Sequence, residues 1–403
     1  MNVFETKTQK ISREREKKQK IMKTKVNGKQ AALCFGMMLS LVLTAILLGC
    51  GDDSKSTTTH TPKFLVALDD TASADNVNVF TVNPSTGDLT PVTGSPFTTG
   101  LSDGAAAVVH PKHGNWIFAA DWTGNVQTLV LGSDGTPTAS SAPSGYSSFG
   151  WVNGLAVSAD GKYLYTSTDG TDIVVWSIDQ STGGLTKAGT YTTPLTETYG
   201  VAVSAGFIYA SDTNSSNRQV HVASIGTTGA LTSVQTVTVP VPMGINGYEL
   251  WTVAVDKTGK FLFVGDENAT ITTYSIGSDG KLTFVGQAVQ NGGDGDMDSI
   301  SISADNKFLY TTTDRTGSAV FSIDQSTGNL TLVTGSPFGT EDSYGSVVVD
   351  PSSKFVYISN ACSDIVAYQR KATDGTLSPL DASSSPTTYA TKYGASCGFA
   401  VSW

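Results

Sequence analysis

The chain is 403 residues long and 39% hydrophobic, with 42 glycines and 14 prolines, so it can bury a large core and make many short strands. Its formal net charge is -10 at pH 7, and the charge is unevenly spread. Residues 1–49 hold ten Lys and Arg against three Glu, which leaves -17 for residues 50–403. A body this acidic repels phosphate backbones, and we therefore expect no nucleic-acid partner.

The N-terminal segment of the chain has the pattern of a targeting signal. Residues 2–30 are basic and polar, and residues 31–49 form a mostly apolar run without charge. A basic segment, an apolar segment and a small residue at the junction predict an export signal over residues 1–49. Met22 is a second candidate for the true start of the chain. An uncleaved transmembrane anchor is the alternative for the apolar run.

The end of this signal, residues 47–50, resembles the bacterial lipobox. The resemblance implies that Cys50 is lipidated and becomes the mature N-terminus. Residues 50–62 are polar with almost nothing to bury, so we expect a flexible tether. Acyl chains and tether together predict a protein held at a bacterial envelope membrane, on its periplasmic or outer side.

A glycine-containing turn recurs through the rest of the chain. Its Thr-Gly and Asp-Gly pairs suit tight hairpins, because glycine adopts positive φ without a Cβ clash. The copies lie at residues 85–90, 133–135, 181–186, 227–232, 278–283, 326–331 and 373–378. These seven turns predict seven hairpins.

A second repeated signal is an aromatic residue about twenty positions before each turn. These anchors are Phe64, Trp116, Tyr163, Phe207, Phe261, Phe308 and Phe355. A strand of small apolar residues precedes most of them, at residues 105–109, 155–157, 201–203, 252–255, 299–302 and 346–349. Each repeat therefore contains four strands, and the sequence predicts an all-β fold: a seven-bladed β-propeller of four-stranded antiparallel blades over residues 63–403.

The two ends of the repeat region complement each other. The first repeat lacks its inner strand, and residues 398–403 match that missing strand. We expect the C-terminal strand to complete the N-terminal blade and close the ring. Cys362 and Cys397 flank strands on the same predicted face, where a disulfide between them would clasp the ring in an oxidising compartment. Two unpaired thiols are the alternative.

The repeated strands and turns resemble the seven-bladed lactonase family, most clearly at residues 177–186 and 322–338. The best-known activity of that family is hydrolysis of 6-phosphogluconolactone, and similar repeats occur in surface-layer propellers without known chemistry. The family's Pro-Arg-His element is absent at the corresponding positions, which are Asn153-Gly154, Tyr199-Gly200 and Tyr344-Gly345. The resemblance thus implies the fold and assigns no catalytic residue, so the catalytic residues stay unknown.

Histidine and arginine are scarce in this chain. The four histidines are His60, His110, His113 and His221, of which the pair at 110 and 113 could bind a metal or form a solvated corner. After the signal, the only arginines are Arg218, Arg315 and Arg370. Three arginines are few for binding a sugar phosphate, which is usually held by several converging guanidinium or ammonium groups.

Acidic residues offer two candidate features. The second strand of most repeats ends in Asp70, Asp121, Asp169, Asp212, Asp266 and Asp314, with Asn360 in the seventh. Blade symmetry would place them around one acidic face that attracts cations or basic partners, whereas the local alternative is that each caps its own turn. In addition, Asp294, Asp296 and Asp298 alternate like the start of a calcium loop, so Ca²⁺ is a candidate cofactor and a solvated acidic loop the alternative.

Aromatic residues gather in the segments that lead into the inner strands. They are Tyr146, Phe149, Trp151, Tyr199, Tyr248, Trp251, Tyr344 and Tyr393. An aromatic rim on one face could bind sugars or peptides, and hydrophobic plugs between blades are the alternative.

The sequence therefore favours an envelope-anchored, monomeric lipoprotein whose propeller binds a small molecule, glycan or protein on one face. A lactone or ester hydrolase is the rival hypothesis, and a purely structural envelope protein the third.

Overall fold

The computed structural model describes residues 60–69, 76–102, 104–140, 151–241, 249–290, 293, 295–338, 345–360, 364–380, 387–391 and 398–403. Within these ranges the secondary structure is β-strand, and no helix is long and apolar enough to cross a membrane. The lipidation candidate Cys50 and the predicted disulfide partners Cys362 and Cys397 lie outside the described residues.

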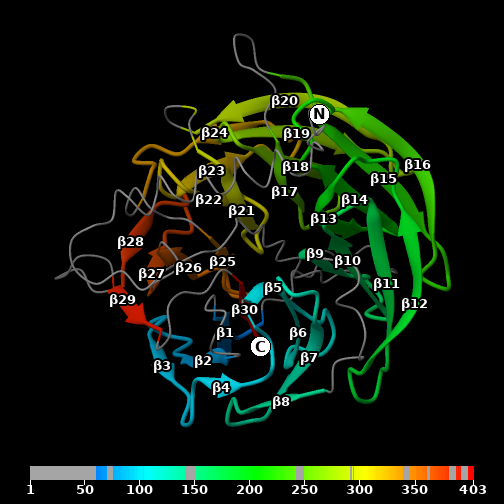
Figure 1. Cartoon of the computed structure of the whole chain (residues 1–403). Helices are drawn as coiled ribbons and strands as arrows, with labels where there is room; N and C mark the ends of the chain where they lie inside the picture. The colour runs from blue at the N-terminus through cyan, green and yellow to red at the C-terminus, as the bar shows by residue number, and fades with distance from the viewer. Residues whose placement is uncertain are drawn as a thin grey trace, which may run out of the picture. The chain divides into compact units, whose positions relative to one another are not determined.

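The strands form seven antiparallel sheets arranged as a ring, numbered here as blades 1 to 7 (Figure 1). Blade 2 consists of β5 (Gly104–Val109), β6 (Trp116–Asp121), β7 (Val126–Leu131) and β8 (Pro137–Ala139). Blade 3 consists of β9 (Val152–Val157), β10 (Tyr163–Thr168), β11 (Asp172–Ile178) and β12 (Leu185–Thr192). Blade 4 consists of β13 (Thr198–Ser204), β14 (Phe207–Asp212), β15 (Gln219–Ile225) and β16 (Leu231–Thr238).

The later blades repeat this order. Blade 5 consists of β17 (Leu250–Val255), β18 (Phe261–Asp266), β19 (Thr270–Ile276) and β20 (Leu282–Val289). Blade 6 consists of β21 (Met297–Ile302), β22 (Phe308–Thr313), β23 (Ala319–Ile323) and β24 (Leu330–Leu332). Blade 7 consists of β25 (Val347–Val349), β26 (Phe355–Asn360), β27 (Asp364–Arg370), β28 (Leu377–Pro379) and β29 (Thr387–Ala390). The predicted all-β propeller of seven blades is confirmed.

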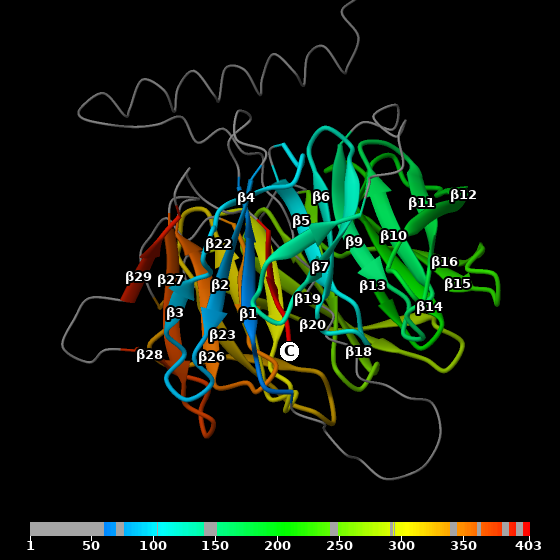
Figure 2. The ribbon, with the colours of Figure 1, turned by 90° about the horizontal axis from the view of Figure 1, so that it is seen from below.

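The ring closes through blade 1, which combines both ends of the propeller. It contains β1 (Phe64–Leu68), β2 (Asn76–Val82), β3 (Leu89–Pro91), β4 (Phe97–Thr98) and the C-terminal β30 (Phe399–Val401). β30 pairs antiparallel with β1, with Val66 opposite Ala400, and lies beside it in Figure 2. The first strands of blades 2 to 7 contact one another in succession, and β30 contacts both β25 and β5. The predicted closure by the C-terminal strand is therefore confirmed, and it leaves no free inner edge.

The hydrophobic core is divided among the interfaces between neighbouring blades. Each of the seven buried clusters draws its residues from two adjacent blades. The cluster between blades 7 and 1, for example, joins Leu65 and Phe80 to Tyr357 and Ile365. Since both faces of each blade are covered, its middle strands are buried nearly throughout.

The two repeated sequence signals meet across these interfaces. The glycine of each turn approaches the aromatic anchor of the preceding blade so closely that an added Cβ would press on or overlap its ring. The pairs are Gly87–Phe355, Gly135–Phe64, Gly183–Trp116, Gly229–Tyr163, Gly280–Phe207, Gly328–Phe261 and Gly375–Phe308. All seven glycines have positive φ. Glycine is thus needed for both the turn and the contact.

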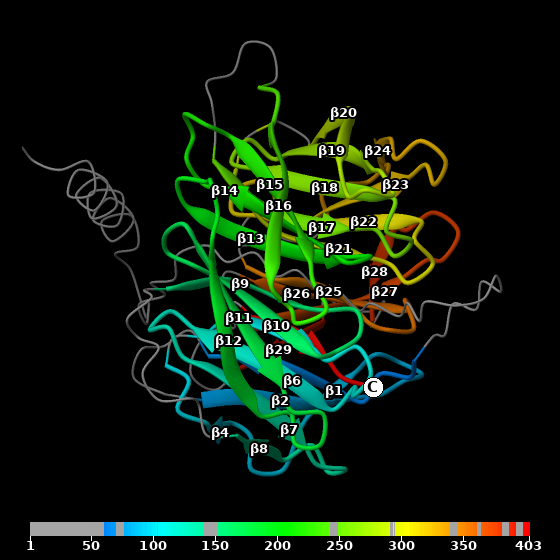
Figure 3. The same cartoon turned by 90° about the vertical axis from the view of Figure 1, so that its right-hand side faces the viewer.

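The outermost strands divide the ring into two parts. In blades 3, 4 and 5 they are eight residues long, and Figure 3 shows β12 and β16 running along the outside of their blades. In the other blades they have three residues. In blades 1 and 7 a further short strand, β4 or β29, pairs again with the third strand. This difference between the blades was not predicted from the sequence.

Candidate functional site

Five of the seven blades are irregular where the inner strand begins. We call this side of the ring the top face, and the side where the inner strands end the bottom face. The pairing of the inner strand with its neighbour shifts there in five blades, at Ala105, Asn153, Tyr199, Trp251 and Asp298. Such bulges re-aim side chains and are common beside functional sites. The five positions carry a methyl, an amide, a phenol, an indole and a carboxyl group, so the top face has no chemical symmetry.

Several of these side chains reach the next blade. The amide nitrogen of Asn153 donates to the backbone oxygen of Thr198 at 3.3 Å. The rings of Tyr199 and Trp251 meet edge to face with centroids 4.9 Å apart. Tyr199 and Trp251 are buried, which agrees with the prediction that such aromatics can act as plugs between blades.

Asp298 is the chemically unusual member of this set. Its side chain is fully buried, and one carboxyl oxygen accepts a 3.1 Å hydrogen bond from the backbone nitrogen of Gly345 in blade 7. The other oxygen has no hydrogen-bond partner among the described residues. Burial, followed by the nearby carboxylates of Asp314 and Asp296, raises the pKa of Asp298 well above its usual value. The group therefore keeps its proton to a much higher pH than an exposed aspartate does.

The neighbouring carboxylates are held by the backbone and by an arginine. The backbone nitrogen of Asp296 donates to Asp314 at 2.8 Å, and Arg315 pairs with Asp314 at 3.5 Å. Within the described ranges no three Asp, Glu, His or Cys side chains lie close enough together to hold a metal ion. Of the predicted calcium ligands, Asp294 lies outside those ranges, so the calcium hypothesis stays a prediction.

The carboxylates at the ends of the second strands occupy two different positions. Asp121, Asp212 and Asp266 are the last residues of β6, β14 and β18, five residues after the aromatic anchor. Asp169 and Asp314 lie one residue further along, because Thr168 and Thr313 end β10 and β22. In blade 1 the equivalent position is Asp69, while Asp70 lies outside the described residues. In blades 2 to 7 the second strand ends five positions after its aromatic anchor, whether or not that position holds an acid.

The strand-end carboxylates are used inside the fold. Asp121 is buried and accepts bonds from the backbone nitrogens of Thr123 and Asn125 in its turn, and from Ser102 before the inner strand. Asp212 accepts bonds from Thr196, Glu197 and Asn214 in the same manner. These contacts are the local capping role that the sequence suggested as an alternative. Asp169, in contrast, is exposed.

Asp266 also forms an ion pair between blades. The guanidinium of Arg218 in blade 4 donates to it at 2.9 Å, and both side chains are buried. Burial raises the pKa of Asp266 although Arg218 acts in the opposite direction. This arginine is therefore committed to the interface of blades 4 and 5.

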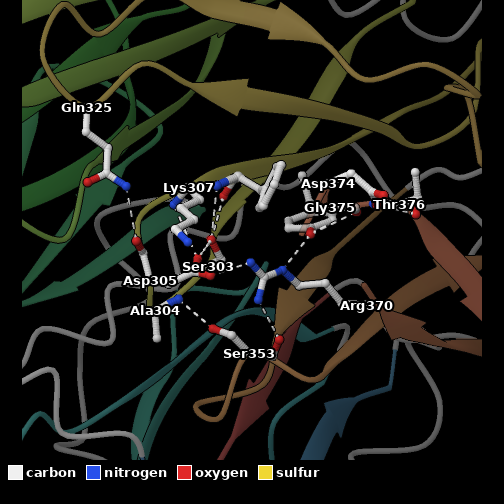
Figure 4. A network of polar contacts seen from close by, with 12 residues as sticks. Ser303, Ala304, Asp305, Lys307, Gln325, Ser353, Arg370, Asp374, Gly375 and Thr376 are labelled. Carbon is white, nitrogen blue, oxygen red and sulfur yellow. Dashed lines mark hydrogen bonds and ion pairs between the residues drawn. The ribbon is translucent and has the colours of Figure 1, made fainter. Parts of the chain in front are cut away.

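Arg370 is committed in a similar way at the bottom face. Its guanidinium donates to Asp305 at 2.6 Å and to the backbone oxygen of Ser353 at 2.8 Å, and Figure 4 marks these contacts with dashed lines. Its Nε donates to the phenol of Tyr310, and its side chain lies over the ring of Phe308. With Arg315 on Asp314, all three arginines beyond the signal have an acidic partner.

The histidines do not contribute to the top face as a metal pair. His110 is buried, and its Nδ1 accepts from the backbone nitrogens of Lys112 and His113 while Nε2 lies 2.9 Å from the oxygen of Gly161. Burial lowers the pKa of His110 to about 4. His113 stacks on Trp116 at 4.0 Å. These residues form a packed corner between blades 2 and 3.

One aromatic pair of the top face reaches the solvent. Trp151 is 37% exposed and meets Trp122 edge to face at 5.6 Å. The indole nitrogens of Trp122 and Trp251 are buried without an acceptor among the described residues. Tyr146, Phe149, Tyr248, Tyr344 and Tyr393 lie outside those residues. Trp122 was missed in the sequence because it follows a second strand and not a segment leading into an inner strand.

The ring of seven antiparallel blades defines the class of the protein as a seven-bladed β-propeller. A sequence profile described as lactonase, 7-bladed beta-propeller, matches residues 133–247 and 297–391, just over half of the chain. The chain therefore belongs to the seven-bladed lactonase family. No curated protein is significantly similar to it.

Solved structures show the same fold at low sequence identity. A candidate 6-phosphogluconolactonase from Bacteroides fragilis is 18% identical with a TM-score of 0.69, over 87% of this chain and 99% of that protein. The periplasmic gluconolactonase of Pseudomonas aeruginosa is 14% identical with a TM-score of 0.66, over 85% and 99%. These likenesses concern the fold.

Proposed function

We propose that this propeller hydrolyses the ester bond of a lactone at its top face. The observation that carries the proposal is that the chain belongs to the lactonase family. The sequence match to that family covers blades 3 and 4 and, separately, blades 6 and 7. The similarity of the fold to a gluconolactonase and to a candidate 6-phosphogluconolactonase supports the same reaction class. Water would attack the ring carbonyl, and the ring oxygen would leave as an alcohol.

We infer further that the substrate is an uncharged lactone. A phosphate group is usually held by convergent guanidinium groups, which form paired hydrogen bonds with its oxygens. Arg218 and Arg370 are buried in ion pairs, and Arg315 pairs with Asp314. Recruiting Arg218 would leave the buried carboxylate of Asp266 without its partner, which costs several kcal/mol, on the order of 3 to 5.

The top face supplies a surface and a rigid frame for such a substrate. The exposed indole of Trp151, supported edge-on by Trp122, offers an apolar platform for the face of a sugar-like ring. Asp298 acts as a positioning residue, since its hydrogen bond fixes the backbone of Gly345 at the start of the inner strand of blade 7. Its burial keeps it from touching the substrate directly.

Binding without turnover is the second candidate function. The exposed Trp151 beside a buried indole that lacks an acceptor favours a sugar or peptide ligand at the top face. We propose for either function that the protein is exported, anchored through Cys50 and monomeric, and the pattern of residues 1–62 supports the export and the anchor.

A titration assay tests the proposal. The full chain is added to plain and phosphorylated sugar lactones at constant pH, and the base needed to neutralise the released acid is recorded. We expect turnover above the spontaneous rate, higher for plain lactones, and its loss on heat denaturation. If folded protein consumes no base above the spontaneous rate but binds a sugar lactone saturably at Trp151, the result would favour a binding module without turnover. Preference for phosphorylated lactones would contradict the inferred substrate.

A further inference from the structure

Charged side chains are distributed unequally between the two faces of the ring. At the top face the charged residues of the described ranges are acidic apart from Arg218 and Arg315. The described lysines lie in or beside the turns of the bottom face, with the exception of Lys187 near the start of β12. They are Lys63, Lys112, Lys162, Lys257, Lys260, Lys281, Lys307, Lys354 and Lys371. The propeller thus has an acidic top face and a bottom face that carries its lysines.

Some of these lysines lie close to the ring axis and have no acidic partner among the described residues. They directly precede the aromatic anchors of blades 1, 5, 6 and 7, at the bottom end of the second strand. We call them the inner lysines: Lys63, Lys260, Lys307 and Lys354. Their side chains are exposed, and within the described ranges they form no ion pair. Their positive charge is therefore available to an external partner.

The carboxylates of the bottom face are engaged locally or lie further from the axis. Asp256 and Asp350 are buried and accept hydrogen bonds from their own turns, and Asp305 pairs with Arg370. Asp160 is exposed beside Lys162, at 3.6 Å. The other acids lie in the glycine turns that lead to the outermost strands: Asp88, Asp134, Asp179, Asp279, Asp324 and Asp374. The bottom face is thus close to neutral as a whole, with positive charge around the axis and negative charge at the rim.

The chain enters the propeller at this same face. The ring of His60 stacks on Trp403 with centroids 4.7 Å apart, and the backbone nitrogen of Lys63 donates to the oxygen of Ser402 at 2.9 Å. His60 follows the proposed lipid site, Cys50, by ten positions. A flexible tether of that length has an r.m.s. span of about 17 Å, whereas a six-residue strand alone spans about 20 Å. The tether would have to stretch along the ring to bring the top face to the membrane.

We propose that the bottom face is the surface that this protein turns toward an anionic lipid bilayer, with the top face directed away from it. The inference rests on the proposed anchor at Cys50 and goes beyond the proposed hydrolysis. Anionic headgroups attract lysines near the membrane surface and repel the acidic top face. The acids of the rim oppose attachment by charge alone, so the anchor supplies the attachment and the charge sets the orientation. The top face then takes its substrate from the aqueous side.

Chemical labelling of the anchored protein tests this orientation. The full acylated chain is added to preformed vesicles of phosphatidylglycerol and phosphatidylcholine, or of phosphatidylcholine alone, with detergent micelles as the reference. A water-soluble amine reagent reports on the inner lysines, and hydroxyl-radical oxidation reports on the exposed Trp151 of the top face. We expect the inner lysines to react about five-fold more slowly on the phosphatidylglycerol vesicles than in micelles. Oxidation of Trp151 should be the same in both.

Two variants separate the effect of charge from that of the tether. Lys260→Gln combined with Lys307→Gln removes half of the inner lysines, and labelling of the other two on phosphatidylglycerol vesicles should move toward the micelle rate. Lys281→Gln is the matched control, because the Lys281 amine lies in a glycine turn of the rim and pairs with Asp279 at 3.0 Å. This control should leave the labelling of the inner lysines unchanged.

Equal labelling of the inner lysines on the two kinds of vesicle would overturn the proposal, and so would slower oxidation of Trp151 on vesicles with unprotected lysines. A chain that does not float with the vesicles would refute the anchor, and the orientation with it. A chain that floats but shows no selective protection would refute the orientation alone. Lactone hydrolysis measured in the same samples is independent of either outcome.

Discussion

The phenol of Tyr357 in blade 7 donates a 2.8 Å hydrogen bond to the backbone oxygen of Gly87 in blade 1. The two residues are 270 positions apart, and the bond spans the interface at which the ring closes. Equivalent bonds join Tyr165 to the oxygen of Gly229 and Tyr310 to that of Gly375. The closing interface is therefore built like the interior ones, with the aromatic strand of one blade holding the glycine turn of the next.

Removing the Tyr357 hydroxyl tests this equivalence. Tyr357→Phe keeps the ring packed and deletes one buried hydrogen bond, which should lower the free energy of unfolding by about 1 kcal/mol. Tyr165→Phe, which loses the same bond between blades 3 and 4, is the matched control and should cost a similar amount. Urea unfolding of both variants measures the two losses. A much larger loss for Tyr357→Phe would show that the closing interface is the weak one.

Glycine is required in the repeated turns for two reasons, the positive φ and the close contact with an aromatic ring, and substitutions can separate these two effects. Gly328 and Gly206 both have positive φ, but an added Cβ would overlap the ring of Phe261 at Gly328 and meets nothing within 4 Å at Gly206. Gly206→Ala should therefore cost about 1 to 2 kcal/mol of stability from backbone strain. Gly328→Ala should cost a further 1 to 3 kcal/mol, roughly, from overpacking. Equal losses in urea unfolding would mean that the contact with Phe261 adapts freely.

The fold could be predicted from the sequence because its two signals are local and repeated. Each blade restates the aromatic anchor and the glycine turn, and the closing strand at residues 398–403 matches the one that blade 1 lacks. The contact between the signals of adjacent blades, as between Gly87 and Phe355, was not predicted. It depends on how neighbouring blades stack, which no single repeat encodes.

The candidate site could be predicted only in part. Sequence reasoning selected Asp298 as a candidate calcium ligand, which stays a prediction, and it did not foresee that this carboxyl is buried and accepts a hydrogen bond from Gly345. The bulge that directs this side chain toward blade 7 leaves no distinct sequence pattern. In blade 1 the pairing register likewise shows what the sequence does not, namely that β1 ends at Leu68 and that Asp69 follows it directly.

The raised pKa of Asp298 predicts a specific dependence of stability on pH. In the unfolded chain this carboxyl ionises near its ordinary pKa of about 4, whereas the folded protein holds the proton to higher pH. The folded state thus binds more protons in the window above pH 4, and stability falls as pH rises through it. Asp298→Asn cannot ionise and retains an acceptor for Gly345, so this variant should gain stability relative to the wild type between about pH 4 and pH 7.

Urea unfolding of the wild type and of Asp298→Asn, each at about pH 4 and at about pH 7, measures this change in stability. Asp179→Asn is the control, since hydrogen bonds from Ser181 and Thr182 lower the pKa of that exposed carboxyl to about 2. Its effect on stability should not change between about pH 5 and pH 7. A wild-type slope that Asp298→Asn leaves intact would show that Asp298 is ionised in the folded protein, with a cation or water compensating its charge.

The platform at Trp151 predicts a loss of substrate binding without a loss of fold. Trp151→Ala removes an indole that is 37% exposed and that meets Trp122 edge to face. If a lactone or sugar ring stacks there, KM or Kd should rise about ten-fold, which corresponds to about 1.4 kcal/mol of binding free energy. Hydrolysis kinetics, or calorimetric titration with a plain sugar lactone, measures the change.

Phe284→Ala is the control for this experiment, because Phe284 is 49% exposed on the outermost strand of blade 5, away from the top face. Both variants lose a large exposed aromatic and should melt close to the wild type. Equal weakening by the two substitutions would indicate nonspecific hydrophobic binding. An unchanged KM in Trp151→Ala would remove the indole from the site and leave the inner-strand bulges, with Asp298 behind them, as the region that must hold the substrate.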